Sequence, residues 1–220
     1  MCQKSPSPIT PNNNVNTHFN HFDKKCLENL QSIVFQTNSM IVISSTWRNS
    51  SRGMSSIFQQ FKKYDLHKKI IGRTPNLSSI LYSKHNNKKV LQIMRTYNVM
   101  EKEMKLFETP PNSTFQYDLR GVEIFSFLKS IKNKYFKGNT DKYLTKSFQN
   151  SPLYNTKVEN FVILDDENDM GALLPLLIQC NAEVGLTQEN ANNAIRILNS
   201  KTNLGNPKKI NYEKKQEMER

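Results

Sequence analysis

Three aspartates follow a short apolar run in the carboxyl-terminal third of the chain. Residues Phe161–Leu164 read Phe-Val-Ile-Leu, and Asp165, Asp166 and Asp169 come directly after them. Such a run suits a strand buried on both faces of a parallel sheet, and open α/β sheets bind ligands beyond the carboxyl ends of their strands. Adjacent carboxylates repel each other unless a cation lies between them, and Mg²⁺ prefers oxygen ligands. The stretch therefore indicates a magnesium site or, alternatively, a turn in which Asp169 caps the next helix.

A second apolar run, far upstream, ends in hydroxyl side chains. Residues Met40–Ile43 are followed by Ser-Ser-Thr-Trp-Arg, which begins with Ser44 and Ser45. Hydroxyl and backbone N–H groups at a strand end can hold a phosphate, especially where a helix begins just beyond them. The alternative interpretation is an ordinary polar loop between a strand and a helix.

Arg120 lies in the first turn of a predicted helix over about 119–136, which Asp118 is suited to cap. A cation in the first turn opposes the helix dipole and costs about 0.3–1 kcal/mol. The position therefore indicates either an anionic ligand or an acidic side chain nearby.

Alternating helices and short strands must position these residues. Apolar spacing predicts four main helices, over about 23–36, 53–64, 119–136 and 187–199. Short strands are predicted over 40–43, 70–71 and 161–164, with a short helix and an edge strand over 173–178. This order predicts an α/β fold with a parallel sheet and flanking helices.

The predicted domain occupies residues 22–199. Residues 1–21 are rich in Pro, Ser, Asn and Thr and are expected to form a disordered leader. Residues of about 76–115 are interpreted as an insertion over the sheet, those of about 137–157 as a second, polar insertion, and 200–220 as a basic tail.

The chain is basic, with a net charge of +12 and a pI near 9.6. Such a balance favours polyanionic partners, although a dispersed surplus also suits a solvated surface. No apolar run approaches the roughly 20 residues of a membrane helix, and no signal peptide is recognisable. The three cysteines, Cys2, Cys26 and Cys180, form no disulfide pattern, so we expect an intracellular protein, cytoplasmic or nuclear, without a membrane association.

The order of the motifs resembles the haloacid dehalogenase (HAD) superfamily, and within it the HAD-like domains of Swiss Army Knife RNA-repair proteins. The resemblance covers about 22–199 and rests on Ile-Val-Ile-Ser-Ser-Thr-Trp-Arg at 41–48 together with Asp-Asp-x-x-Asp at 165–169. Gly-Arg-Thr-Pro at 72–75 and Arg-Gly-Val-Glu-Ile at 120–124 lie between them in the expected order. The resemblance implies a Rossmann-like HAD fold and a Mg²⁺-dependent phosphohydrolase acting on a phosphorylated substrate, with RNA or DNA ends as candidates.

The resemblance also implies a role for each candidate residue. Ser44, with Ser45 as the second choice, would donate a hydrogen bond to the phosphoryl group. Arg120 would neutralise that group, since a guanidinium matches phosphate oxygens. Asp165 and Asp166 would hold Mg²⁺, with Asp169 as a supporting ligand or as an acid that contacts a ligand instead of the metal.

One family motif is missing from the sequence. HAD phosphatases begin with a strand that ends in Asp-x-Asp, whose first Asp attacks phosphorus and whose second acts as acid and base. Before Ser44 the only acids are Asp23 and Glu28, and neither fits this pattern. We therefore expect a fold without its usual first strand and a polypeptide without the nucleophile. Either the chain begins after the first motif, or it is a non-catalytic relative.

Overall fold

The computed structural model describes residues 22–77, 92, 95–97, 99–111, 113, 117–132, 143–155 and 158–200. The predicted leader over 1–21 and the tail beyond 200 lie outside the described residues. Parts of both predicted insertions lie outside them as well.

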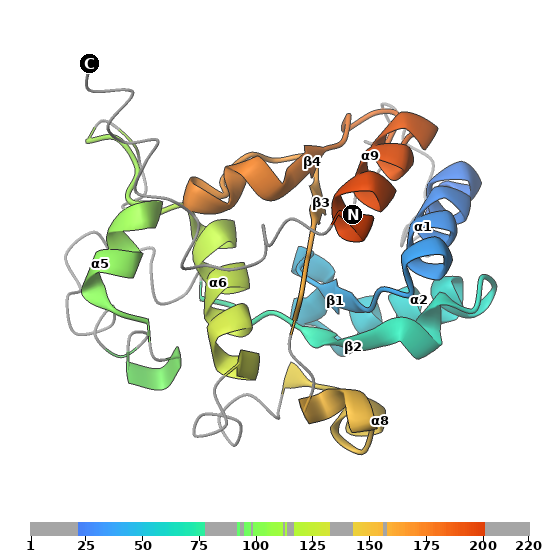
Figure 1. Cartoon of the computed structure of the whole chain (residues 1–220), viewed down its shortest axis with the longest axis horizontal. Coiled ribbons are helices and arrows are strands. Elements are labelled where there is room, and N and C mark those ends of the chain that lie inside the picture. Colours follow the sequence, from blue (N-terminus) through green and yellow to red (C-terminus); the bar gives the residue numbers. More distant parts are fainter. Residues whose placement is uncertain are drawn as a thin grey trace, which may run out of the picture.

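Two pairs of parallel strands lie at the centre of the fold. β1 (Ile41–Ile43) pairs with β2 (Ile70–Arg73), and β3 (Ile163–Asp165) pairs with β4 (Leu177–Gln179). Within the described residues, the two pairs are separate two-stranded sheets. In Figure 1 they lie between α6 on one side and α1 with α9 on the other. The predicted α/β class, with parallel strands and flanking helices, is confirmed.

The four predicted helices, α1, α2, α6 and α9, begin close to where the sequence predicts, whereas α8 and η6 lie in the segment expected to be a polar loop. The α-helices are α1 (Lys24–Thr37), α2 (Ser51–Lys62), α5 (Glu101–Met104), α6 (Leu119–Lys132), α8 (Lys146–Gln149) and α9 (Gln188–Asn199). The 3₁₀ helices are η1 (Thr46–Asn49), η2 (Leu66–Lys69), η3 (Lys105–Phe107), η6 (Pro152–Asn155) and η7 (Gly171–Leu176). Side-chain caps explain the starts of α1, α2 and α9, because Asp23, Ser50 and Thr187 each accept a hydrogen bond from a first-turn N–H group.

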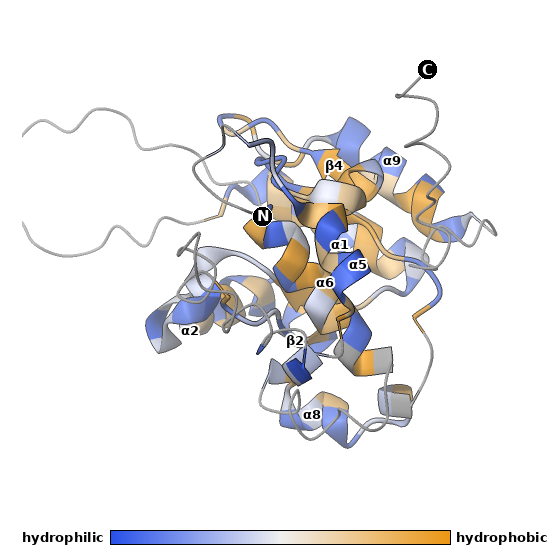
Figure 2. Cartoon of the chain, turned by 90° about the vertical axis from the view of Figure 1, so that its left-hand side faces the viewer, coloured by the Kyte–Doolittle hydropathy of each residue, from blue (hydrophilic) through white to orange (hydrophobic). Residues whose placement is uncertain are grey.

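The core consists of two clusters that meet at the β3–β4 pair. Alternate residues of β3 face opposite clusters, because Ile163 lies in the cluster around α6 and Leu164 packs on the cluster of α1, α2 and α9. On β4, Leu177 and Ile178 divide in the same way. Figure 2 shows the apolar colouring of the inner ribbons at α1 and α6 and the more hydrophilic colouring of α2 at the edge. Because an apolar cluster packs on each face of β3, the direction of the carboxyl end of this strand is fixed.

Helix α6 is enclosed along most of its length. Every residue from Gly121 to Leu128 is buried, including the polar side chains of Glu123 and Ser126. The described part of the 76–115 insertion contributes to this enclosure, because Val99, Met104 and Phe107 belong to the α6 cluster. This segment was expected to lie over the sheet; its described residues pack against α6 and η7, in the cluster that also contains Ile163 of β3.

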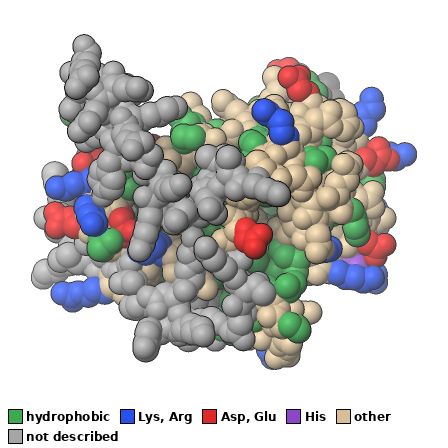
Figure 3. Space-filling model, viewed as in Figure 1, with side chains coloured by type: hydrophobic (Ala, Val, Ile, Leu, Met, Phe, Trp, Pro, Cys, Tyr) green, Lys and Arg blue, Asp and Glu red, His purple; other side chains and the backbone are tan. Residues whose placement is uncertain are grey.

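Charged side chains are distributed over the visible surface. On the face shown in Figure 3, Lys and Arg alternate with Asp and Glu, and the coloured residues form no continuous basic patch there. Within the described ranges, no helix is both long and apolar enough to cross a membrane.

Candidate functional site

The carboxyl ends of β1 and β3 are joined by one side chain from α6. Arg120 donates a hydrogen bond through Nη1 to the carbonyl oxygen of Ser44, which directly follows β1. Its Nε lies 3.6 Å from Oδ2 of Asp165, the last residue of β3. The side chains of Arg120 and Asp165 are only 12% and 9% exposed. The structure therefore brings Ser44, Arg120 and Asp165 together, although they lie far apart in the sequence.

Helix α6 is held at this place by a close backbone contact. Gly121 donates its N–H to the carbonyl oxygen of Asp169 at 3.0 Å. A Cβ atom at Gly121 would lie 2.4 Å from the carbonyl oxygen of Met170, so only glycine permits the approach. The contact places the first turn of α6, and with it Arg120, beside the loop that follows β3.

Asp169 has one carboxylate oxygen engaged and one without a partner. Its Oδ2 accepts a hydrogen bond from the backbone N–H of Arg120 at 3.3 Å. Within the described residues, its Oδ1 is buried and has no hydrogen-bond partner. Burial raises the pKa of Asp169, the N–H and charge of Arg120 oppose the rise, and the negative charges of Glu167 and Asp165 add to it. An additional cation at Oδ1 would offset this cost.

Asp165 is fixed by the loop as well as by Arg120. Its Oδ1 accepts a hydrogen bond from the N–H of Glu167 at 3.3 Å, and its carbonyl oxygen accepts one from the N–H of Cys180 at 2.8 Å. The stretch that begins with Asp165 therefore forms part of the turn that the alternative interpretation predicted. Asp166 is half-buried, and its carbonyl oxygen accepts from Nε2 of Gln179 at 3.0 Å.

The carboxylates of Asp165, Asp166 and Asp169 offer the oxygen ligands that Mg²⁺ prefers, but they do not form a complete coordination site. Mg²⁺ takes one or two carboxylates together with water and phosphate oxygens, and the partnerless Oδ1 of Asp169 near Asp165 suits that role. In the part of the chain that the structure describes, no group of three or more His, Cys, Asp or Glu side chains is arranged to hold a metal ion. Arg120 occupies part of the space around Asp165.

The two serines have different surroundings. Oγ of Ser44 lies 3.4 Å from the hydroxyl of Thr74, which follows β2. The hydroxyl of Ser45 instead caps η1 by accepting a hydrogen bond from the N–H of Trp47 at 3.4 Å. Ser44 therefore faces the end of the neighbouring strand, and Ser45 fulfils the role of a polar loop residue.

Two charged residues near the site were not among the sequence candidates. The side chains of Arg48 and Glu123 form an ion pair and are only 3% and 5% exposed. Arg48 also donates a hydrogen bond to the carbonyl oxygen of Ser44. Burial raises the pKa of Glu123, and the guanidinium of Arg48 opposes the rise. The sequence contained one indication that Glu123 is unusual, because this residue is the only acid in the apolar stretch from 121 to 128.

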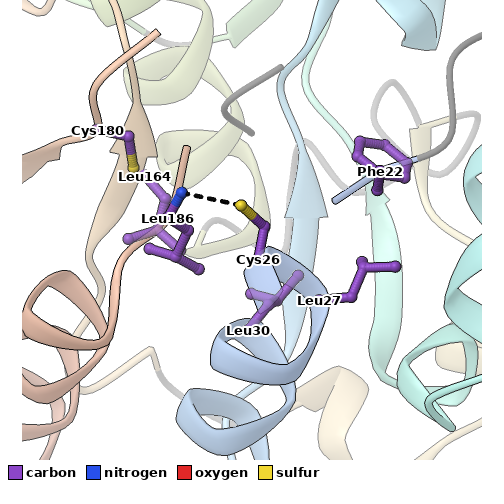
Figure 4. A pocket seen from close by; sticks show the side chains of 7 residues that line it. All are labelled: Phe22, Cys26, Leu27, Leu30, Leu164, Cys180 and Leu186. Carbon is purple, nitrogen blue, oxygen red and sulfur yellow. Dashed lines mark hydrogen bonds between the residues drawn. The ribbon is translucent and has the colours of Figure 1, made fainter. Parts of the chain in front are cut away.

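A separate apolar pocket lies between α1, β3 and the loop before α9 (Figure 4). Its lining includes Cys26, Leu30, Leu164 and Cys180 and contains no charged side chain. Sγ of Cys26 accepts a hydrogen bond from the N–H of Leu186 at 3.2 Å. Such a pocket cannot neutralise a phosphate, so the strand ends remain the candidate site.

The chain matches a known protein family. The model of the family described as the HAD domain in Swiss Army Knife RNA repair proteins matches residues 3–191. Comparisons with curated proteins and with solved structures gave no match. The matched range includes β1, α6, β3 and every residue of the candidate site.

Proposed function

Because the chain belongs to the family of HAD domains in Swiss Army Knife RNA repair proteins, we propose that it carries the phosphate- and metal-binding part of a Mg²⁺-dependent phosphohydrolase for nucleic-acid ends. The observation that supports the proposal best is the position of Arg120. Its guanidinium lies between the strand end that carries Ser44 and the one that carries Asp165. A phosphoryl group bound there would contact a cation and hydroxyl groups within one small volume.

Each residue of the site has a chemical role in this proposal. Arg120 stabilises the negative charge of the phosphoryl oxygens, which a guanidinium can contact with two N–H groups. Ser44 donates its hydroxyl hydrogen to one of these oxygens. Asp165, Asp166 and Asp169 would hold Mg²⁺, which when bound supplies further charge stabilisation to the phosphoryl group.

The sequence of 220 residues contains no candidate for the nucleophile. No Asp-x-Asp motif precedes Ser44, so we propose that the present chain binds the phosphorylated end without turning it over. The second candidate function, a non-catalytic module that binds phosphate or RNA, shares the same site. The absence of the motif favours it, because no residue assigned here forms a covalent intermediate.

Binding and turnover assays together test the proposal. The present chain should bind a terminally phosphorylated RNA oligomer more tightly than its hydroxyl-ended counterpart when Mg²⁺ is present, and should release no inorganic phosphate. If coding sequence upstream of Met1 contains an Asp-x-Asp motif, the extended chain should release phosphate. An extended chain that carries the motif and stays inert would support the non-catalytic module, whereas equal binding of both oligomers would refute a site for the terminal phosphate.

A further inference from the structure

Arg48 and Glu123 form a buried network directly beside the candidate phosphate site. Arg48 reaches three acceptors, namely the carbonyl oxygens of Ser44 and, at 3.3 Å, Pro75, and Oε2 of Glu123. Oε1 of Glu123 accepts a hydrogen bond from the N–H of Leu77 at 2.9 Å. The network thus connects the loops after β1 and β2 with the middle of α6.

Two guanidinium groups converge on one backbone oxygen. The carbonyl oxygen of Ser44 accepts a hydrogen bond from Arg48 and another from Arg120. A carbonyl oxygen has two lone pairs, so both acceptor positions are used. The peptide that follows Ser44 is therefore held from two sides, and the direction of the Ser44 side chain depends on both arginines.

The network also fixes the segment that carries Arg48. Nη1 of Arg73, at the end of β2, donates a hydrogen bond to the carbonyl oxygen of Arg48 at 2.6 Å. Thr74 donates its N–H to the carbonyl oxygen of Ile43 at 2.9 Å. The end of β1 is consequently tied to the end of β2 on both sides of Ser44.

Stability alone is a poor explanation for this pair of charges. Moving two ions out of water costs free energy that their attraction often fails to recover, and apolar residues of similar size commonly replace a buried ion pair without loss of stability. In the described part of the chain, Nε of Arg48 is also buried without a partner. A positioning role accounts for retaining the charges in spite of this cost.

We propose that Arg48 and Glu123 are positioning residues for phosphate binding. Glu123 orients the guanidinium of Arg48, Arg48 holds the carbonyl oxygen of Ser44, and this fixes the Ser44 hydroxyl and the Arg120 guanidinium in one arrangement. The inference rests on the proposed function, since it assigns these residues to the same site.

The test separates positioning from stability by replacing the whole pair. Arg48→Met combined with Glu123→Gln removes both charges and leaves an amide oxygen that can accept from the N–H of Leu77, so its melting temperature should stay close to that of the wild type. Its affinity for a terminally phosphorylated RNA oligomer in Mg²⁺ should nevertheless fall by about tenfold or more, because Ser44 loses one of its two donors. A folded double variant with wild-type affinity would overturn the inference.

Two further variants keep the test decisive. Arg48→Lys retains the charge but lacks the fork that reaches three acceptors. This variant should fold and bind the phosphorylated oligomer several-fold more weakly, and wild-type affinity would also overturn the inference.

Lys129→Met is the control, because it removes an ion pair of α6, to Glu103 at 2.9 Å, that does not contact Ser44. The affinity of this control should remain unchanged. A comparable loss in the control would show that any lost ion pair on α6 has the same effect.

The outcomes also distinguish this inference from the proposed function. If Arg120→Ala abolishes the preference for phosphorylated RNA while both Arg48 variants bind normally, the proposed function stands and the positioning role is wrong. If the wild-type chain shows no such preference, both are wrong.

Discussion

The guanidinium of Arg120 donates a hydrogen bond to the carbonyl oxygen of Ser44, 76 positions earlier in the chain. The contact places a cation from the start of α6 against the residue that directly follows β1. It also explains why a positive charge is tolerated in the first turn of a helix, since Asp165 and Asp169 both lie close to it. The unfavourable interaction with the helix dipole is offset locally, and the cation is held at the strand ends.

Replacement of Arg120 should impair phosphate binding more than folding. Arg120→Ala should weaken the binding of a terminally phosphorylated RNA oligomer by about 10- to 100-fold, because a charge-assisted contact is lost. Isothermal titration calorimetry measures this change. Arg196→Ala removes an exposed cation on α9 that donates a hydrogen bond to Oδ1 of Asn193 at 3.1 Å, and it should leave the affinity within about twofold of the wild type at constant salt. Equal losses in both variants would show that only net charge matters.

Replacement of Asp165 should remove the effect of magnesium. In the wild type, Mg²⁺ should raise the melting temperature, because a ligand that binds only the folded state stabilises it. Asp165→Asn should abolish this rise, since an amide is a weaker ligand for a hard cation. Differential scanning fluorimetry over a Mg²⁺ series gives the readout.

The matched control for this measurement is Asp65→Asn. Asp65 is exposed and has a left-handed backbone with φ of 56°, which asparagine also adopts readily. The control should retain the magnesium response. A response that survives in Asp165→Asn and in the wild type alike would exclude Asp165 as a ligand.

Addition of a methyl group at Gly121 should destabilise the protein. The new Cβ in Gly121→Ala would lie 2.4 Å from the carbonyl oxygen of Met170, a backbone atom that cannot rotate away. We expect a loss of about 1–3 kcal/mol in the free energy of unfolding, measured by urea denaturation. Ser55→Ala, on the exposed face of α2, should be neutral or slightly stabilising. Wild-type stability in Gly121→Ala would show that α6 can shift away from the loop after β3.

Alkaline pH should destabilise the protein partly through Tyr97. Burial, followed by the hydrogen bond to Tyr143, raises the pKa of Tyr97 above its ordinary value. A raised pKa means that the folded state keeps a proton which the unfolded state loses above pH of about 10. The contribution of Tyr97 is therefore complete below that pH and is lost as pH rises further, by about 1.4 kcal/mol per pH unit.

Denaturation as a function of pH checks this expectation. Tyr97→Phe should be less stable at neutral pH by about 1 kcal/mol, because one hydrogen bond is lost, but its stability should decline less steeply above pH of about 10. Identical slopes in the two proteins would show that Tyr97 ionises equally easily in both states.

The sequence was most informative where local patterns determine structure. Helices α1 and α9 were predictable because Asp23 and Thr187 cap them and an apolar stripe follows at helical spacing. The strands were predictable because each contains a short apolar run, and the acidic residues at the end of β3 and the serines after β1 mark their ends. Parallel pairing then accounts for the alignment of strand ends within each pair.

Contacts between distant segments were beyond what local patterns contain. The pairing of Arg48 with Glu123 joins residues 75 positions apart, and neither residue indicates its partner in the sequence. The packing of Met104 and Phe107 on α6 likewise depends on the tertiary arrangement. The sequence identified the ends of the strands, and the structure identified the side chains that connect them.

The most direct test of the central claim compares two RNA oligomers that differ only in a terminal phosphate. The claim is that Ser44, Arg120 and Asp165 form one phosphate-binding site with Mg²⁺. Calorimetry in Mg²⁺ should show at least about tenfold tighter binding of the phosphorylated oligomer, and this difference should disappear in Arg120→Ala. Equal affinity of the wild-type protein for both oligomers would contradict the claim.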